Sequence, residues 1–177
     1  WDARGGLWVA TSPIYPHIMP GARPSDEIIV LEDTDGDGTF DRSVTFAQGI
    51  RWPTSVCCYN GGIFVLAPPT LHYFKDTNND GKADLHQVVF NGFGRDNVQS
   101  VANNLKWGLD NRITLAAGRN PGQLTHNNKP VLTLGGKDFS FDPRTLDVQS
   151  LTGGVQFGNS FDAWGNRFVC SNSNHIQ

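Results

Sequence analysis

Short apolar runs, separated by glycine, proline, asparagine and aspartate, recur along the whole chain. Four of these runs follow one another closely, at 54–59, 62–67, 70–75 and 84–90. The links between them, such as Asn60-Gly61 and Pro68-Pro69, are too short for helical crossovers. The pattern therefore predicts an antiparallel meander of four short strands.

The same pattern repeats with a period of about fifty residues. A second block has runs at 103–109, 112–117, 137–142 and 146–152, with an excursion over 118–136. A weaker block precedes the first, and a partial one begins near Gly158. The apolar residues that open one strand of each block are Leu7, Ile63, Ile113 and Phe168, which lie 56, 50 and 55 residues apart.

A four-strand unit of this period is typical of a β-propeller. A sandwich is also all-β, but it does not repeat its hairpins at a fixed interval. We therefore predict an all-β fold, a β-propeller of about three and a half four-stranded blades. Residues 1–177 form either a single propeller domain or a fragment whose remaining blades, or a covering partner, lie elsewhere in the parent protein.

Composition supports this fold class and narrows the partners. Glycine and proline supply 30 of the 177 residues, and only Glu27 and Glu32 of the 17 acidic residues are glutamate, a balance that disfavours helices. A net charge of -3 without a basic cluster predicts no nucleic-acid partner. The apolar runs are too short to cross a bilayer, so we expect no membrane insertion by this segment. The chain begins at Trp1 without a leader, so we expect any targeting peptide to be removed or to lie upstream.

Two acidic loops share one template and begin 43 residues apart. Their first, third and fifth residues offer side-chain oxygens, the sixth is glycine, the seventh can offer its carbonyl, and the ninth is aspartate. An all-oxygen set on a flexible loop suits Ca²⁺ better than Mg²⁺ or a transition metal. The predicted metal ligands are Asp33, Asp35, Asp37, Thr39 and Asp41 in the first loop, and Asp76, Asn78, Asp80, Lys82 and Asp84 in the second.

Charge repulsion favours an ion over an empty loop. Two unit charges about 5 Å apart repel by about 1 kcal/mol in water and about 3 kcal/mol at an effective dielectric near 20. The alternative is a metal-free hairpin held by Asx turns. Asn78 replaces one carboxylate, so we expect the second loop to bind more weakly. Because both loops join consecutive strands, we expect them to stabilise hairpins rather than to take part in catalysis.

Polar residues gather in the links that should form the opposite face of a propeller. Such a face is the default ligand site, although asparagine and arginine there can equally satisfy the loop backbone. His126 could be a general base or a solvated loop residue, and the other four histidines, at 17, 72, 86 and 175, show no metal-ligand spacing. The residues on this face are Arg51, Arg95, Asp96, Asn97, Asn103, Asn104, Asn120, His126, Gln156 and Asn159.

Several motifs give the chain a family resemblance. They are the Asp33–Asp41 loop, Trp52-Pro53-Thr54, Phe74-Lys75-Asp76 through Asp84, Gly92-Phe93-Gly94-Arg95 and Asn103 through Gly108. The chain resembles the N-terminal propeller of the membrane-bound dehydrogenases of planctomycete-type bacteria, which are distantly similar to the soluble glucose and sorbosone dehydrogenases. The resemblance covers nearly the whole chain and implies an exported protein, periplasmic or at the cell surface.

The resemblance also implies an activity. It suggests a calcium-stabilised propeller segment of a quinoprotein-like dehydrogenase that oxidises a sugar or another alcohol with pyrroloquinoline quinone. Electrons would pass to haem in a separate domain of the parent chain. Arg51, Arg95, Asn97 and Asn104 are the candidate binders of the quinone carboxylates.

The resemblance assigns no catalytic residue. Many relatives carry paired histidines near residues 97–100, where this chain has Asn97-Val98-Gln99-Ser100. The competing hypothesis is a non-catalytic propeller that binds carbohydrate or protein in a cell-surface assembly. Cofactor binding and substrate turnover distinguish the two hypotheses.

Overall fold

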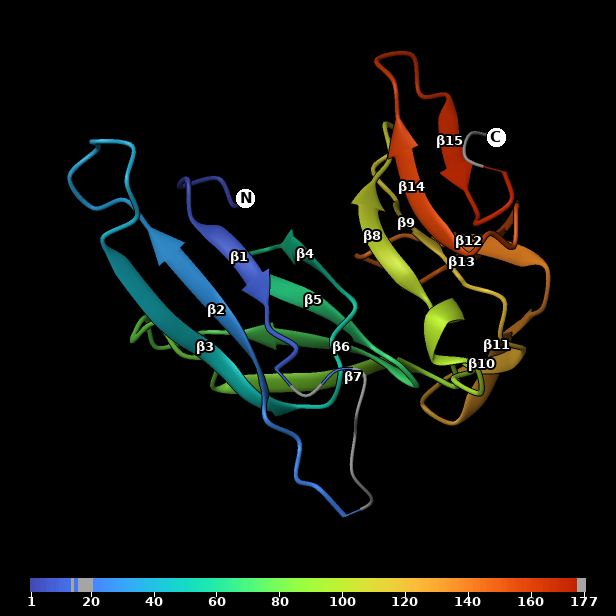
Figure 1. The fold of residues 1–177 in the computed structure, drawn as a ribbon, viewed down its shortest axis with the longest axis horizontal. Coiled ribbons are helices and arrows are strands. Elements are labelled where there is room, and N and C mark those ends of the chain that lie inside the picture. The colour runs from blue at the N-terminus through green and yellow to red at the C-terminus, as the bar shows by residue number, and fades with distance from the viewer. Residues whose placement is uncertain (14, 16–20, 175–177) are drawn as a thin grey trace.

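The computed structural model describes residues 1–13, 15 and 21–174, and the chain forms only β-sheets and connecting loops there, apart from one 3₁₀ turn (Figure 1). His17 and His175, which show no metal-ligand spacing in the sequence, lie outside these residues. No helix in the described ranges is long and apolar enough to cross a membrane. The prediction of an all-β fold is confirmed.

The strands of the described residues form four antiparallel sheets. The first contains β1 (Leu7–Ala10), β2 (Asp26–Glu32) and β3 (Arg42–Ile50). The second contains β4 (Ser55–Tyr59), β5 (Gly62–Ala67), β6 (Thr70–Lys75), β7 (Leu85–Asn91), β10 (Gly122–His126) and β11 (Lys129–Leu134). The third contains β8 (Asn103–Trp107), β9 (Ile113–Ala116), β12 (Lys137–Phe141) and β13 (Val148–Thr152). The fourth contains β14 (Phe157–Phe161) and β15 (Arg167–Cys170).

Both predicted meanders are present, with bounds within a few residues of those expected from the sequence. Strands β4 to β7 follow each other in the second sheet, and β8, β9, β12 and β13 do so in the third. The tight turn between β4 and β5 depends on Asn60 and Gly61, which both have positive φ angles, at 46° and 73°. Asparagine and glycine tolerate this left-handed conformation, and that tolerance explains why the sequence signal was reliable here.

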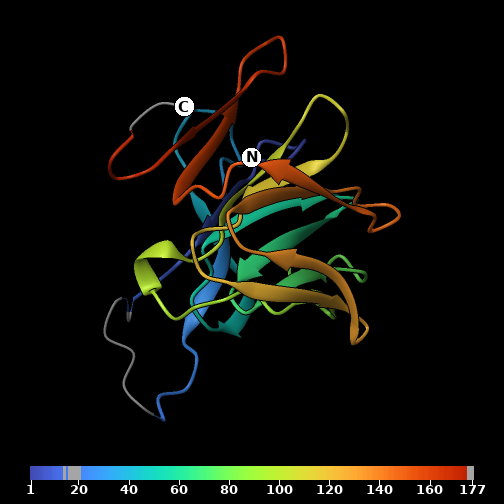
Figure 2. The same cartoon turned by 90° about the vertical axis from the view of Figure 1, so that its right-hand side faces the viewer.

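The excursion over 118–136 forms the β10–β11 hairpin, which the sequence did not predict as strands. Thr125 of β10 pairs with Asn91 at the end of β7, so the hairpin extends the second sheet to six strands (Figure 2). Leu124 and Leu134 are buried in the same core cluster as Phe90. Burial of these side chains against a neighbouring sheet determines the structure of the hairpin.

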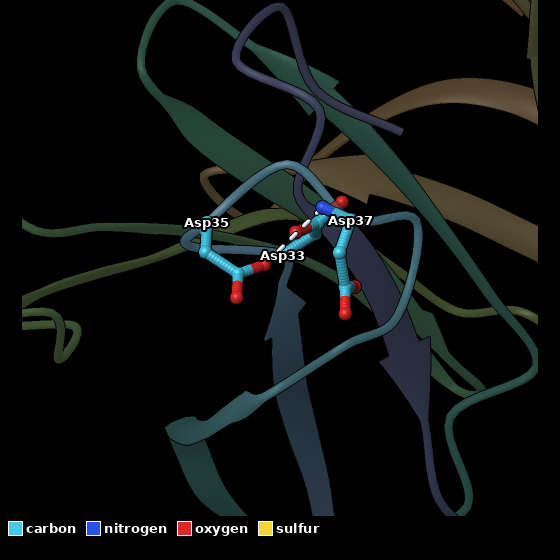
Figure 3. A group of neighbouring side chains, drawn as sticks. All are labelled: Asp33, Asp35 and Asp37. Carbon is cyan, nitrogen blue, oxygen red and sulfur yellow. Dashed lines mark hydrogen bonds between the residues drawn. The ribbon is translucent and has the colours of Figure 1, made fainter.

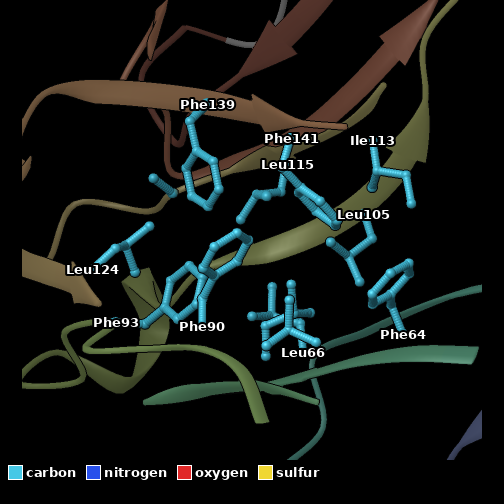
Figure 4. Packing of buried hydrophobic residues seen from close by; sticks show 14 of the residues in the cluster. Phe64, Leu66, Phe90, Phe93, Leu105, Ile113, Leu115, Leu124, Phe139 and Phe141 are labelled. Atoms are coloured by element: carbon cyan, nitrogen blue, oxygen red, sulfur yellow. The ribbon is translucent and has the colours of Figure 1, made fainter. Parts of the chain in front are cut away.

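Two hydrophobic clusters lie between neighbouring sheets. The larger one joins the second and third sheets and is rich in phenylalanine (Figure 4). Phe141 packs edge-on against both Phe64 and Phe90, with ring centroids 5.3 and 5.5 Å apart. The smaller cluster joins the first and second sheets, where Phe46 of β3 and Phe74 of β6 are both buried. The sheets are therefore stacked face to face around shared cores.

The strands that begin each successive sheet lie next to one another. Strand β4 contacts β1 and β8, and β8 contacts β14. Thr54, just before β4, donates a hydrogen bond of 2.7 Å to the Ala102 carbonyl before β8. Asn103, at the start of β8, donates one of 3.0 Å to the Gln156 carbonyl before β14. The same contact thus recurs from the second sheet to the third and from the third to the fourth.

A second contact recurs one residue further along. The Ser55 hydroxyl accepts a hydrogen bond of 2.8 Å from the Leu105 amide, and Asn104 donates one of 3.2 Å to the Asn159 carbonyl. Asn104 has a φ angle of 57°, a left-handed conformation that asparagine tolerates. These side-chain to backbone bonds fix the register of each first strand against the next.

We predict that Thr54→Val lowers the free energy of unfolding by about 1 to 2 kcal/mol, because the Ala102 carbonyl loses its hydroxyl donor while valine keeps the shape. Urea denaturation monitored by tryptophan fluorescence measures the change. Thr70→Val is the matched control, since the Thr70 hydroxyl only reaches the exposed Asn91 side chain. Equal stability of the two variants would contradict a role for Thr54 between sheets.

Candidate metal centre and polar face

The first acidic loop is the turn between β2 and β3, where the final strand pair is Glu32 with Arg42. Asp33 organises this loop, because its two carboxylate oxygens accept hydrogen bonds from the Gly36 and Gly38 amides at 2.7 and 2.9 Å. The bond from Gly38 is the largest cause that lowers the pKa of Asp33. Asp33 therefore remains a carboxylate at neutral pH.

Three carboxylates converge in this loop (Figure 3). Asp33, Asp35 and Asp37 each offer one oxygen, and these oxygens lie within 4.8 Å of one another. Two oxygens bound to opposite sides of one Ca²⁺ lie at most about 5 Å apart, given bonds of about 2.3 to 2.6 Å. One oxygen of Asp35 and one of Asp37 accept amide hydrogen bonds, at 3.2 and 2.6 Å, and their second oxygens accept none from the described residues. The spacing of these three carboxylate oxygens therefore fits a calcium ion.

The ninth residue of each loop closes the base of the loop. The Thr34 hydroxyl donates to Asp41 at 2.8 Å, and the Thr77 hydroxyl donates to Asp84 at 2.6 Å. The Thr77 bond is the largest cause that lowers the pKa of Asp84. The predicted template does not include these threonines, although a threonine follows the first aspartate in both loops.

The second loop, between β6 and β7, follows the same path. Asp76 accepts hydrogen bonds from the Asn79 and Gly81 amides at 2.7 and 2.8 Å, as Asp33 does in the first loop. Here the Asn78 amide group also donates to Asp80 at 3.3 Å, so an amide hydrogen occupies one carboxylate oxygen.

The two seventh positions also match. The backbone amides of Thr39 and Lys82 donate to Asp37 and Asp80, at 2.6 and 2.9 Å. Both loops therefore repeat one hydrogen-bond scheme. The candidate metal ligands of the second loop carry less negative charge, because Asn78 replaces a carboxylate.

The polar face contains short hydrogen-bond networks within the protein. Asn97 caps the 3₁₀ turn η1 (Val98–Ser100), because its side-chain oxygen accepts the Gln99 amide at 3.0 Å. Asn120 is buried and accepts the Asn97 amide at 2.9 Å, while its own amide group donates to the Asn97 carbonyl. The structure thus brings together Asn97 and Asn120 from the predicted ligand face.

Three of the four residues assigned to quinone make side-chain hydrogen bonds to the backbone of other residues. Asn104 donates to the Asn159 carbonyl, and Arg51 donates to the Ala22 carbonyl at 3.0 Å. Arg95 is exposed and has no hydrogen bond to a described side chain. Within the described ranges no two of Arg51, Arg95, Asn97 and Asn104 share a hydrogen bond. These four side chains therefore do not form a preorganised binding site for the quinone carboxylates.

His126 is also held by local hydrogen bonds. Its Nδ1 lies 2.7 Å from the Val89 carbonyl oxygen, and its Nε2 lies 3.0 Å from the Asn127 amide nitrogen. The contact with Val89 ties the β10–β11 hairpin to β7.

One buried ion pair was not predicted. Asp138, at the start of β12, is fully buried and pairs with Arg167 of β15. The other oxygen of Asp138 accepts the Ala117 amide at 3.0 Å. A side chain at Gly153 would collide with this carboxylate, so glycine is required there. The pair joins the third and fourth sheets. Its two residues are 29 positions apart, so no local sequence pattern predicts their contact.

Comparisons with known proteins give the chain a family without an assigned activity. No curated protein and no solved structure matches it significantly. The family model described as "Domain of unknown function (DUF7133)" matches residues 1–177. The chain with its paired acidic loops therefore belongs to the DUF7133 family.

Proposed function

We propose that this chain is a calcium-stabilised segment of a β-propeller that serves as a scaffold in a larger exported assembly, with its four sheets as consecutive blades. The observation that carries the proposal is the hydrogen-bond scheme shared by the two acidic loops. The recurring contacts between β4, β8 and β14 also support it, because the first strands of neighbouring propeller blades surround a common axis.

The proposed role of calcium is structural. Each ion would neutralise the carboxylates at one hairpin end, and so hold β2 against β3 and β6 against β7. In the first loop Asp33, Asp35 and Asp37 would bind it, and in the second Asp76, Asn78 and Asp80. Both loops are turns between paired strands, a position that couples ion binding to hairpin stability.

Calcium titration by calorimetry on the chelator-treated protein tests this proposal. We expect two ions per chain, and Asp35→Asn should weaken the tighter site by about tenfold, because it gives the first loop the ligand set of the second loop. Asp96→Asn is the matched control, because Asp96 is an equally exposed aspartate outside both loops. Failure of the protein to take up calcium, or an unchanged affinity of the tighter site in Asp35→Asn, would reject the metal role.

The second loop gives a prediction in the opposite direction. Asn78→Asp should tighten its calcium affinity by about tenfold, because a carboxylate replaces a neutral ligand and removes the amide donor beside Asp80. The same calorimetric titration should then show two sites of similar affinity. An unchanged or weaker second site would show that this residue does not contact the ion.

The dehydrogenase implied by the family resemblance is the second candidate. We propose it on the sequence motifs alone, with pyrroloquinoline quinone at the polar face, a sugar or alcohol substrate and haem in another domain. The side chains of Asn97, Asn104 and Arg51 are hydrogen-bonded to backbone groups of other residues, which favours the scaffold. A dye-reduction assay of the full-length parent protein, with quinone, calcium and a sugar panel, separates the two candidates. Turnover supports the dehydrogenase. Absence of both quinone binding and turnover supports the scaffold.

A further inference from the structure

Two histidines of the second sheet face each other, although their positions in the sequence show no ligand spacing. His72 on β6 and His86 on β7 are diagonal neighbours, because His72 pairs with Val88 and His86 pairs with Phe74. The Nδ1 atom of His72 lies 2.9 Å from the Nε2 atom of His86. The hairpin thus brings two imidazole nitrogens from different strands to one point.

The surroundings hold these rings in place. The His86 ring stacks on Phe74 with a centroid separation of 4.4 Å and an interplanar angle of 8°. Phe74 is itself buried in the cluster between the first and second sheets. Because β6 and β7 are paired along their length, the two histidines need little further ordering to act together.

The outer nitrogen of each ring can gain or lose a proton, so each histidine can change its tautomer. Neither Nε2 of His72 nor Nδ1 of His86 has a hydrogen-bond partner among the described residues. Burial, followed by the proximity of His86, lowers the pKa of His72 to about 4, so its ring is neutral at ordinary pH. A metal ion could therefore replace the shared proton, which would move to an outer ring nitrogen or to solvent.

The separation of the two nitrogens matches a metal chelate. Bonds of about 2.0 to 2.1 Å at a right angle place two nitrogens about 2.9 Å apart. Such neighbouring positions occur in the square-planar and octahedral geometries of Cu²⁺ and Ni²⁺, for which imidazole is a suitable ligand. His86 also lines a cleft of about 330 Å³ with Gln48, Lys82 and Asp84, so water can complete the coordination.

We propose that His72 and His86 form a binding site for a divalent transition metal, with Cu²⁺ held most tightly. The ion would join β6 to β7 beside the first sheet, next to the end of the second acidic loop, whose Asp84 lines the same cleft as His86. The site uses nitrogen ligands, whereas the acidic loops use oxygen ligands, so the two kinds of ion are selected independently.

Metal titration in the presence of saturating calcium tests this site, because calcium occupies the acidic loops. Calorimetry with Ni²⁺, which does not oxidise thiols, should give one ion per chain. His72→Asn and His86→Asn should each weaken this binding by at least about tenfold, since loss of even an indirect ligand partner has that effect. Electron paramagnetic resonance of the Cu²⁺ form should show coupling to two nitrogens.

His126→Asn is the control, because asparagine can still donate to the Val89 carbonyl and the residue lies on β10. It should bind Ni²⁺ as the unmodified protein does. Thermal melts check that each variant is folded. The nitrogen coupling is measured on the unmodified protein, so it tests the site even if a variant does not fold. The proposal is overturned if Ni²⁺ is not taken up, if both histidine variants bind like the control, or if Cu²⁺ shows no nitrogen coupling.

Discussion

Replacing Arg167 with alanine should lower the free energy of unfolding by about 3 to 5 kcal/mol, because it leaves the buried Asp138 carboxylate without its counter-ion. Asp138 cannot reach water, and its remaining bond to the Ala117 amide satisfies only one oxygen. The same change removes the donor to the Thr152 carbonyl. Urea denaturation measures the loss, and we expect the transition to move to a lower urea concentration.

Arg144→Ala is the matched control for this prediction. Arg144 also pairs with an aspartate, Asp142, at 2.7 Å, but the arginine side chain is 67 % exposed. Exposed pairs contribute little because water screens them. The double variant Asp138→Leu/Arg167→Leu should recover part of the loss, since no unpaired charge remains. Similar losses in Arg167→Ala and Arg144→Ala would show that the third and fourth sheets do not depend on this pair.

Removal of calcium should lower the melting temperature by about 10 to 20 °C. A ligand that binds only the native protein stabilises it by about 2.7 kcal/mol at a concentration one hundred times its Kd. For a chain of this size, each kcal/mol corresponds to about 2 to 4 °C, and two occupied sites act together. Differential scanning calorimetry with excess calcium and with excess chelator gives the difference.

Variants separate the loops from non-specific effects of the ion. Asp33→Asn combined with Asp76→Asn should melt at the same temperature with calcium and with chelator. Asp96→Asn should retain the full calcium response, because Asp96 lies outside both loops. If the unmodified protein melts identically in the two conditions, the acidic loops are metal-free turns held by Asx hydrogen bonds.

The sequence predicted those parts of the fold that depend on neighbouring residues. Asn60-Gly61 identified a tight turn, and short apolar runs identified the strands on either side. The acidic loops were equally readable, because most of their hydrogen bonds join residues of one short template. Thr34 and Thr77 were missed only because the template used for comparison did not include the second position.

Contacts between distant segments were not predictable in this way. The β10–β11 hairpin lies in a stretch that reads as a loop, and it becomes sheet because Leu124 is buried against β7 and the third sheet. The pairing of Asp138 with Arg167 and of His72 with His86 depends on register and on stacking of sheets. On the polar face, residue types suggested a ligand, while the geometry shows Asn97 and Asn104 bound to the backbone.

The added hairpin also changes how the largest sheet ends. An outer strand with free amides and carbonyls can recruit a strand from another molecule and so begin aggregation. Here that outermost position belongs to β11, which opens with Lys129 and Pro130. Proline lacks an amide hydrogen, and a lysine charge repels a second copy of the same border. The hairpin thus gives the largest sheet an outer strand whose first two residues disfavour pairing with a second molecule.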